Sequence, residues 1–328
     1  MIIARAPLRI SFFGGGSDLP SFYRSEAGAV VSTAIDKYIY IAINRKFDNK
    51  IRASYSITEM VDSVAEVKHE LIREGLKLMG IDGGIEITSI SDIPSQGTGL
   101  GSSSTYTVAL LHGLYTFKGK YIDSERLAAE TCRIEIELCG KPIGKQDQYI
   151  AAYGGLRYIQ FNPDESVFVD HVMMHSEMLE KLQSRLMLFY TGLTRSANDI
   201  LAQQSRATAS DSAKRAALSR MVGIASRVRD DLQNERLDSF GEALHAGWIE
   251  KKSLVAGISS KEIDTWYDRA VGAGALGGKL LGAGGGGFLL FYVPAGKRDA
   301  VVGALRELRY IPFRFEPQGS KILYYDER

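Results

Sequence analysis

A short glycine-rich stretch followed by hydroxyl side chains is the feature of this sequence best suited to chemistry. From Pro94 to Thr105 the chain reads PSQGTGLGSSST. Glycine tolerates φ > 0 and lets a ligand approach the backbone closely. Alternating residues at 85–88 predict a strand before this stretch, and 102–117 has helical character. A strand, a glycine turn and a helix start direct free N–H groups and the positive helix dipole at one point, which suits a phosphate. An ordinary helix capped by serine would give the same pattern.

Two familiar phosphate-binding motifs do not explain this stretch. It is not a P-loop, because no lysine precedes Ser104 and Thr105 as G-x-x-x-x-G-K-[ST] requires. The pattern G-x-G-x-x-G does match from Gly282 to Gly287. However, a predicted strand at 288–293 follows these glycines, where the dinucleotide fingerprint needs a helix. The sequence therefore excludes the Rossmann interpretation.

A second stretch, from Arg5 to Asp18, places charges around three further glycines. Arg9 falls on a predicted strand, and Asp18 follows the glycines at 14–16 and a serine. This order would put a cation and a carboxylate at the rim of a hollow lined by backbone. An aspartate in such a position is as often a turn or cap residue, so both interpretations stay open.

Together these residues supply the parts that phosphoryl transfer needs, namely a phosphate cradle, Mg²⁺, a cation and a positioned base. Magnesium takes oxygen ligands, usually one or two of them from protein. A serine hydroxyl at the start of the 102–117 helix and a carboxylate from the next helix would provide them. Asp147 is the candidate base and Arg9 the candidate cation. The combination, more than any single residue, predicts phosphoryl transfer.

The N-terminal half that must position these residues is predicted to consist of short strands and helices. Apolar or alternating runs between turn signals predict strands at 2–5, 8–13, 29–33, 38–44, 51–55, 156–161 and 167–172. Helical spacing predicts helices at 66–79 with Gly80 as the C-cap, at 102–117, at 123–138, and a short one from about 146.

The C-terminal half alternates longer helices with strands, so the fold class is α+β in two domains. A boundary near 175–185 would divide the chain into domains 1–180 and 181–328. Beyond it we expect strands at 185–190, 288–293, 311–315 and 321–325. We expect helices at about 197–234 with a break near 207–210, and at about 236–256, 260–272 and 297–309.

Composition argues against several classes of partner. The 328 residues carry a net charge of +1, which gives no electrostatic reason to expect nucleic acid or an anionic membrane as a partner. The only cysteines, Cys132 and Cys139, form no metal-binding spacing, and reduced thiols are expected. No signal peptide and no apolar run approaching about 18 residues is present. We therefore expect a cytoplasmic protein with small-molecule partners, whose oligomeric state the sequence leaves open.

Three motifs, in order and spacing, resemble those of the GHMP small-molecule kinase superfamily. Residues 6–18 resemble the substrate-side motif A-P-G-[RK]-V-x-L-x-G-E-H-x-D. Residues 94–105 resemble the nucleotide loop P-x-x-x-G-L-G-S-S-[AS], and residues 279–288 resemble K-x-x-G-A-G-G-G-G-x. The resemblance spans essentially the whole chain. It implies a β-rich N-terminal α/β domain with the nucleotide loop, a C-terminal α+β domain, an active site in the cleft between them, and ATP and Mg²⁺ as cofactors.

Carried over position by position, the resemblance implies a role for each motif residue. Ser103 matches the serine that binds magnesium, and Glu135 matches the acidic ligand. Glu137 is the competitor, because residues two apart on a helix point in different directions and only one can enter the site. Asp147 matches the catalytic aspartate and Arg9 the cation beside it. The implied ATP-binding residues are Gly97, Thr98, Gly99, Leu100, Gly101, Ser102, Ser103 and Ser104, and the implied supporting loop contains Gly282, Gly284, Gly285 and Gly286.

Departures from the family pattern refine the substrate. Where galactokinases carry Glu-His, this chain has Gly15 and Gly16, which should open space beside the sugar. The patterns P-L-R-I-S-F-x-G-G-G-[ST]-D and G-K-P-I-G-K-Q-D-Q-Y are similar to those of bacterial heptose-phosphate kinases. This similarity implies phosphorylation of the anomeric hydroxyl of D-glycero-D-manno-heptose 7-phosphate to the 1,7-bisphosphate, on the route to nucleotide-activated heptose for surface polysaccharide. The implied substrate-binding residues are Gly16, Ser17, Asp18, Lys145, Asp147, Gly192 and Arg195, and the cations that could bind a second phosphate are Lys141, Lys145, Arg157, Arg195 and Lys279.

Several alternatives stay open. Fucokinase domains share the first of these patterns, so fucose or another sugar could be the substrate of a 1-kinase of this fold. An isoprenoid or amino-acid kinase of the same fold is a further enzymatic alternative. A sensor that binds nucleotide and sugar without turnover belongs to another class. The presence of Asp147, Ser103 and Glu135 argues against the sensor, which has no need of a base and metal ligands.

Overall fold

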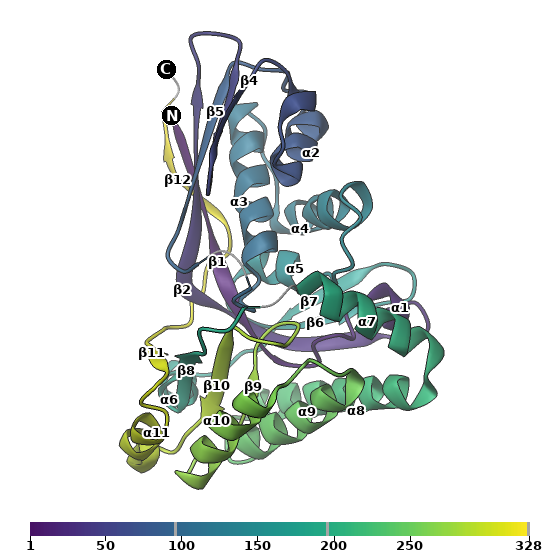
Figure 1. Cartoon of the computed structure of the whole chain (residues 1–328), viewed down its shortest axis with the longest axis vertical. Helices are drawn as coiled ribbons and strands as arrows, with labels where there is room; N and C mark the ends of the chain where they lie inside the picture. Colours follow the sequence, from purple (N-terminus) through teal and green to yellow (C-terminus); the bar gives the residue numbers. More distant parts are fainter. Residues whose placement is uncertain (95–96, 195–196, 327–328) are drawn as a thin grey trace.

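A computed structural model describes residues 1–94, 97–194 and 197–326, and it confirms the predicted α+β architecture. Within these ranges the strands form an eight-stranded and a four-stranded sheet, each accompanied by helices (Figure 1). The first sheet has the order β12-β1-β2-β5-β3-β4, and β6 pairs with both β2 and β7. Its strands are β1 (Ile2–Phe13), β2 (Gly28–Arg45), β3 (Ile51–Ser54), β4 (Thr58–Val61), β5 (Ile85–Ser91), β6 (Leu156–Phe161), β7 (Val167–His171) and β12 (Lys321–Tyr325).

The long pair β1 and β2 replaces what the sequence predicted as four shorter strands. Both strands are continuous, and their antiparallel register shifts between Pro7 and Leu8 and again between Ser11 and Phe13. Proline cannot donate a hydrogen bond to the ladder, so a register shift beside it lets the strand continue. The second half of β1, which carries Arg9, is buried from Ala6 to Phe13.

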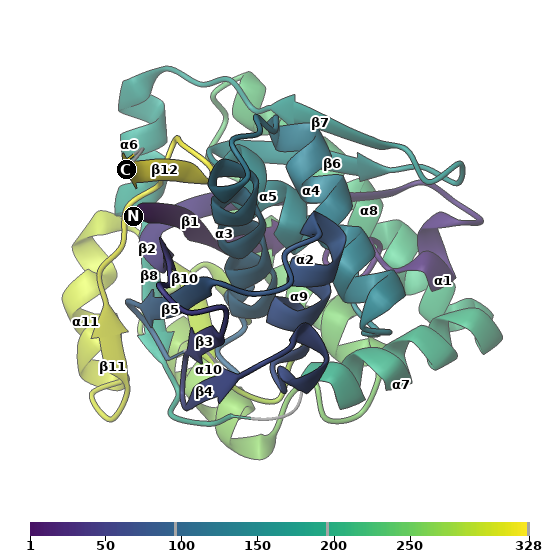
Figure 2. The same ribbon diagram turned by 90° about the horizontal axis from the view of Figure 1, so that it is seen from above.

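Helices α2 (Glu70–Met79), α3 (Ser102–Phe117), α4 (Ser124–Cys132) and α5 (Gln146–Tyr153) cover one face of the first sheet. Viewed from above, α3 lies among the other three helices (Figure 2). Its buried side chains include Val108, Leu111 and Leu114, and it packs on β1 and β2. Gly80 ends α2 with φ 59°, which confirms the predicted C-cap.

The second sheet has the order β11-β8-β10-β9. Its strands are β8 (Leu186–Tyr190), β9 (Gly277–Leu280), β10 (Phe288–Tyr292) and β11 (Arg309–Ile311). The helices of this half are α6 (Ser176–Ser184), α7 (Ala197–Ser210), α8 (Ser212–Gln233), α9 (Phe240–Leu254), α10 (Lys261–Gly272) and α11 (Arg298–Ala304), while α1 (Pro20–Tyr23) is a single turn near the N-terminus. Figure 1 shows α8 and α9 side by side, and α8 also contacts β2.

Several elements of this half differ from the prediction. Helix α6 occupies the segment that was predicted as a domain boundary, and β9 was not predicted. The break in the long helical segment falls at Asp211, whose carboxylate accepts a hydrogen bond from the Ala213 N–H at 2.8 Å and caps α8. Strand β11 begins at Arg309, before the predicted 311–315.

The last strand returns to the first sheet. β12 pairs antiparallel with β1, with Ile2 opposite Tyr325, so the first and the last strand of the chain are neighbours (Figure 1). A division of the chain at residue 180 would therefore place β1 and the edge strand that pairs with it, β12, in different domains. The two halves also share a core, in which the Phe240 ring packs edge-on against the rings of Phe12 and Phe13 at centroid distances of 5.5 and 5.2 Å. None of the helices described by the structure is both long and apolar enough to span a membrane.

Candidate active site

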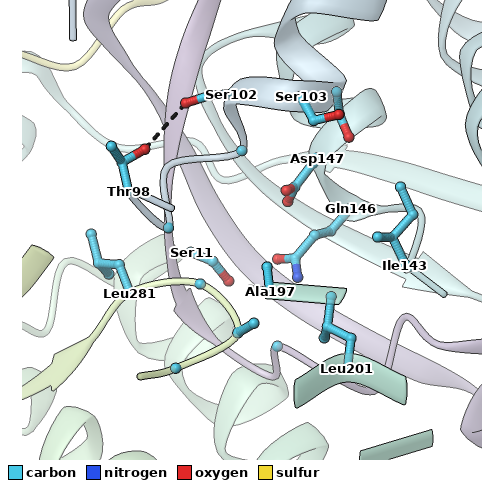
Figure 3. Close-up of a pocket in the computed structure, with 18 of the residues that line it drawn as sticks. Ser11, Thr98, Ser102, Ser103, Ile143, Gln146, Asp147, Ala197, Leu201 and Leu281 are labelled. Atoms are coloured by element: carbon cyan, nitrogen blue, oxygen red, sulfur yellow. Dashed lines mark hydrogen bonds between the residues drawn. The ribbon is translucent and has the colours of Figure 1, made fainter. Parts of the chain in front are cut away.

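A cavity of about 870 Å³ lies where the start of α3, the loop after β1, the loop before β10 and helices α5, α7 and α9 converge (Figure 3). Its wall contains residues from both halves of the chain. The lining residues include Arg9, Ser11, Gly15, Gly16, Asp18, Gly97, Thr98, Gly99, Gly101, Ser102, Ser103, Ser104, Lys141, Gln146, Asp147, Lys251, Lys279, Gly282, Gly284 and Gly286.

The predicted phosphate cradle forms one wall of this cavity. Gly97, Gly99 and Gly101 have φ values of 68°, 75° and 77°, a region that side chains other than glycine rarely adopt. Gly101, not a serine, is the N-cap of α3, and it makes no side-chain cap hydrogen bond. The Ser102 hydroxyl instead lies 3.2 Å from the Thr98 hydroxyl (Figure 3). The first turn of α3 is therefore left without the side-chain cap that would compete with an anion for its N–H groups.

The glycines before β10 support this cradle by direct backbone contact. A Cβ added at Gly282 would lie 2.5 Å from the Gly99 Cα, and one at Gly287 would lie 2.3 Å from the Thr98 carbonyl oxygen. Gly284 and Gly286 pack in the same way against Ile258 and Leu193, and the Gly285 N–H donates to the Ile258 carbonyl at 3.0 Å. Only glycine allows this approach, so the loop can brace the cradle from the second half of the chain.

Arg9 and Asp147 form the central ion pair of the site. The Arg9 guanidinium donates from Nε and Nη2 to the two Asp147 carboxylate oxygens at 2.7 and 2.8 Å, and from Nη1 to the Gly99 carbonyl at 2.6 Å. The Arg9 side chain is 5% exposed and the Asp147 side chain 22% exposed. Lys145 is the N-cap of α5 and makes no side-chain cap hydrogen bond, while the first N–H of the helix, that of Gln146, donates to the Asp18 carboxylate, so Asp147 is not its cap. The carboxylate points into the cavity between Ser103 and Gln146 (Figure 3).

Glu135 lies beside Ser103, and a wider helical turn brings it there. The predicted helix 123–138 is α-helical only to Cys132, and η2 (Arg133–Leu138) is a π-helix in which the Cys139 N–H donates to the Ile134 carbonyl at 2.9 Å. Glu135 is fully buried, while Glu137 is exposed. The same turn leaves Leu138 44% exposed.

The residues around Glu135 fit a magnesium ion. The Ser103 hydroxyl donates to Glu135 Oε1 at 2.9 Å, and the Gln148 amide donates to Oε2 at 2.7 Å. The Lys141 ammonium lies 3.1 Å from the Ser103 Oγ and 3.7 Å from Glu135 Oε1, so a cation already lies at this pair of oxygens. In the described parts of the chain, no cluster of three or more His, Cys, Asp or Glu could hold a metal alone. One carboxylate and one hydroxyl suit Mg²⁺, which usually takes its other ligands from phosphates and water.

Asp18 is a second carboxylate close enough to Asp147 to feel its charge. It is 3% exposed, and its carboxylate accepts hydrogen bonds from the N–H groups of Gly16 at 2.9 Å and Gln146 at 3.3 Å. Burial, and then the charge of Asp147, raises the pKa of the Asp18 carboxyl. A Cβ at Gly144 would lie 1.9 Å from Asp18 Oδ2, so only glycine fits there.

The loop glycines beside Asp18 differ from the prediction of open space. A Cβ at Gly16 would lie only 2.2 Å from the amide nitrogen of Gln204, which comes from α7. The space next to Gly16 is thus filled by a polar side chain from the other half of the chain. Gly15 does border free space, because its added Cβ would make only ordinary contacts with Ser11 Oγ at 3.5 Å and Gln146 Nε2 at 3.6 Å.

Some residues predicted to bind the substrate, ATP or a second phosphate do not reach the cavity wall. Ser17 is buried, and its hydroxyl donates to the Gly14 carbonyl at 2.8 Å. Lys145 pairs with Glu165 at 2.6 Å and lies over the Tyr23 ring. Gly192 has φ 72° and is not among the lining residues. Leu100 is buried and does not line the cavity. Arg157 donates a hydrogen bond to the Gly154 carbonyl. Arg195 lies outside the described residues.

Six polar residues that line the cavity were not predicted from the sequence: Ser11, Glu70, Gln146, Thr194, Asn198 and Lys251. The buried Gln204, which contacts Gly16 without lining the cavity, was not predicted either. Gln204 and Lys251 come from long helices in which polar side chains usually face solvent, so their spacing carries no signal. Gln146 is adjacent to the predicted base, and Ser11 lies two residues after Arg9 on the same strand. For these two, the alternation of side chains along a strand and the position at a helix start were the available signals.

Comparison with known proteins gives two family matches. Residues 59–155 match the model of the GHMP kinases N terminal domain, and residues 228–310 match that of the GHMP kinases C terminal domain. Together the two ranges include more than half of the chain.

Individual relatives are similar over most of this chain. It is 27% identical to D-glycero-alpha-D-manno-heptose 7-phosphate kinase of Campylobacter jejuni, over 98% of both chains. It is 28% identical to L-fucokinase/L-fucose-1-P guanylyltransferase of Bacteroides fragilis, over 88% of this chain and 34% of that protein. The fold matches the crystal structure of a D-glycero-D-manno-heptose 1-phosphate kinase from Bacteroides thetaiotaomicron with a TM-score of 0.82, 24% identity and complete coverage of both chains.

Proposed function

Because this chain belongs to the GHMP kinase family, we propose that it transfers the γ-phosphoryl group of ATP to the anomeric hydroxyl of a sugar. The proposed substrate is D-glycero-D-manno-heptose 7-phosphate, and the product is the 1,7-bisphosphate. The reaction would take place in the cytoplasm, on the route to nucleotide-activated heptose for surface polysaccharide. The observation that carries the proposal is the Arg9–Asp147 pair, which faces the cavity directly beside the uncapped start of α3.

In this proposal Asp147 is the general base. The sugar hydroxyl oxygen forms a bond to the γ-phosphorus while its proton passes to an Asp147 carboxylate oxygen, and the bond from that phosphorus to the oxygen bridging to the β-phosphate breaks, releasing ADP. Each Asp147 oxygen accepts one hydrogen bond from Arg9 and keeps a lone pair for the proton. Arg9 fixes the orientation of the carboxylate and offsets its negative charge.

The phosphate end of the proposed site rests on α3 and the glycine loops. Backbone N–H groups of Gly97–Ser104 would contact the phosphates, with the glycines from 282 to 286 bracing the loop. Ser103 and Glu135 would hold Mg²⁺, whose chemistry there is to neutralise negative charge on the phosphate oxygens. Lys141, 3.1 Å from the Ser103 hydroxyl, adds a second positive charge at the same end.

Two lines of support favour a heptose phosphate. One relative at 27% identity is named as a heptose 7-phosphate kinase and matches 98% of this chain. The P-L-R-I-S-F-F-G-G-G-S-D segment from Pro7 to Asp18 has the form typical of such kinases. Fucose is the second candidate, because a fucokinase is equally similar in sequence over 88% of this chain.

A coupled ADP-release assay over D-glycero-D-manno-heptose 7-phosphate, L-fucose, D-galactose and mevalonate tests the proposal. We expect turnover with the heptose phosphate at a kcat/KM well above that for the other three. Faster turnover of fucose would replace the proposed substrate while leaving the chemistry intact. Tight ATP binding that depends on sugar, without release of ADP from any of them, would contradict the kinase proposal and favour a sensor.

A further inference from the structure

One part of the cavity wall carries charged groups that the proposed chemistry does not use. Lys251 comes from α9 and Lys279 from β9, and both side chains line the cavity although the residues are only 5% and 7% exposed. The Lys251 ammonium donates to Gln204 Oε1 at 3.0 Å and to the Gly15 carbonyl at 3.4 Å. The Lys279 ammonium donates to the carbonyls of Ser11 and Phe12 at 2.9 and 3.0 Å.

These two ammonium groups have only neutral hydrogen-bond partners. Across the described residues, no carboxylate oxygen lies within 4.0 Å of either one. Burial lowers the pKa of Lys251 to about 8, and burial together with the charges of Lys251 and Arg9 lowers that of Lys279 to about 7. A buried charge without a counter-charge is costly, so the arrangement favours an anion from outside.

The charged neighbours do not remove this excess of positive charge. Arg9 is matched by Asp147, with which it makes two hydrogen bonds. Asp18 interacts electrostatically with Lys251. However, burial and the Asp147 charge raise the pKa of Asp18, which favours its neutral form. Two lysines thus face at most one additional carboxylate.

Polar atoms without partners surround the same place. The Gln204 amide nitrogen and the Ser11 hydroxyl are buried and have no hydrogen-bond partner. Both border the Gly15–Gly16 turn, where the absence of side chains leaves the backbone in contact with Gln204 and with the cavity. Figure 3 shows Ser11 and Gln146 pointing into the hollow on the side of Ala197 and Leu201. Unpaired buried donors are uncommon in proteins, and they indicate a ligand rich in acceptor oxygens.

We propose that Lys251 and Gln204, which are hydrogen-bonded to each other and contact the Gly15–Gly16 turn, form a subsite for a phosphate monoester that the sugar carries before the reaction. The inference rests on the proposed function and deepens it, since it concerns the far end of the same substrate. A phosphate dianion offers three acceptor oxygens and the missing negative charge. A neutral sugar such as fucose would leave the ammonium groups uncompensated. The substrate class is therefore a sugar phosphate, and a preceding reaction must supply the sugar already phosphorylated.

Calorimetric titration of the full chain without ATP tests the subsite separately from catalysis. The ligands are D-glycero-D-manno-heptose 7-phosphate and the same heptose without its phosphate. The wild type should bind the phosphorylated sugar at least about 30-fold more tightly. Lys251→Met should weaken binding of the phosphorylated sugar by about 10- to 100-fold, as expected for a hydrogen bond to a charged group, and of the neutral sugar by less than about 3-fold.

Lys252→Met is the matched control, because the next lysine along α9 pairs with Asp264 at 3.1 Å and does not line the cavity. Gln204→Leu is the second variant, and it should weaken binding of the phosphorylated sugar by about 3- to 10-fold. This second variant tests the same subsite if Lys251→Met does not fold. Melting curves and ATP affinity establish that each variant is intact.

Equal wild-type affinity for the two sugars would overturn the subsite, and so would an equal loss for both sugars in Lys251→Met. A different result would contradict the proposed function. Preferential binding of the phosphorylated sugar without any ADP release would leave the subsite standing and overturn the kinase proposal. Rapid turnover of both sugars with equal dissociation constants would do the reverse.

Discussion

The two ends of the cavity differ in how their charges are compensated. At the phosphate end, Glu135 accepts hydrogen bonds from Ser103 and Gln148, with the Lys141 ammonium 3.7 Å away. In the centre, Arg9 and Asp147 compensate each other. At the opposite end, Lys251 and Lys279 bond only to neutral oxygens, and the Gln204 amide nitrogen has no partner.

This difference indicates two ways of using binding energy. The compensated end is organised before a ligand arrives, which suits stabilisation of a transition state whose charge is always the same. In our proposal the uncompensated end receives its counter-charge from the substrate, so it would reject a sugar that brings none. We therefore expect changes at the first end and the centre to act mainly on catalysis and nucleotide, and changes at the second end to act on the choice of sugar.

The largest effect should come from Asp147→Asn. The amide keeps the size of the carboxylate but cannot take a proton, so kcat should fall by about 10²- to 10⁴-fold, the usual contribution of a general base. Binding of the sugar should survive. Asp123→Asn is a control for a purely structural aspartate, because Asp123 caps α4 by accepting from the Arg126 N–H at 2.8 Å. Measuring kcat and Tm on both variants separates the two roles. A normal kcat in Asp147→Asn would show that Asp147 is not the general base.

Gly101→Val should next abolish tight ATP binding, raising the KM for ATP by at least about 100-fold, because a β-branched residue resists φ > 0 and blocks the backbone. Gly101 has φ 77°, and its added Cβ would lie 3.1 Å from Asp147 Oδ2. Gly119→Val imposes the same backbone strain at φ 65°, with nothing within 4 Å of the added Cβ. If both variants lose equal stability but keep ATP affinity, Gly101 is not part of the cradle.

Glu135→Gln should weaken the response to Mg²⁺. Loss of the carboxylate charge should raise the Mg²⁺ concentration for half-maximal rate by about 10- to 100-fold, since even residues one layer behind metal ligands have effects of this size. Mn²⁺ binding followed by electron paramagnetic resonance in the presence of ADP gives a readout besides activity. Glu137→Gln, at an exposed position on the same helical turn, should behave as the wild type. The reverse pattern for the two glutamates would assign the metal to Glu137.

The smallest effect concerns the stability of Lys251→Met. Burial lowers the pKa of Lys251 from 10.5 to about 8, so below pH 8 the buried ammonium is charged and costs stability. Between pH 8 and 10.5 the unfolded chain holds this proton and the folded chain does not, so the cost falls as the pH rises. The methionine variant should thus gain stability relative to the wild type, on the order of 1 kcal/mol at pH 6, and the gain should shrink toward pH 10. Melting curves at several pH values check this, and a gain that grows with pH would contradict the uncompensated charge.

The geometry of the proposed phosphate end and of the centre was predictable because its signals are local. The spacing of Gly97, Gly99 and Gly101 before a helix predicts the cradle, and α3 begins at the expected Ser102. Arg9 and Asp147 belong to motifs whose residue types identify their chemistry. Glu135 could not be separated from Glu137 by pattern, because the π-turn that buries one and exposes the other depends on a backbone bond between Cys139 and Ile134.

The uncompensated end, where we propose that the sugar binds, could not be predicted because its residues meet only through tertiary packing. Gln204 and Lys251 come from α7 and α9 and face a turn that lies about 190 to 240 residues earlier in the sequence. Gly16 was predicted to leave open space, and Gln204 fills that space. The same limit applies to β12, whose existence was predicted but whose pairing with β1 at the opposite end of the chain was not.

The most direct test of the central claim is the position of the new phosphate. The wild-type chain is incubated with ATP, Mg²⁺ and D-glycero-D-manno-heptose 7-phosphate, and the product is examined by ³¹P NMR with proton coupling. The account predicts a second phosphorus signal coupled to the anomeric proton, beside the unchanged signal of the 7-phosphate, and a far slower appearance of this signal with Asp147→Asn. A new signal coupled to any other carbon-bound proton, or release of inorganic phosphate alone, would contradict it.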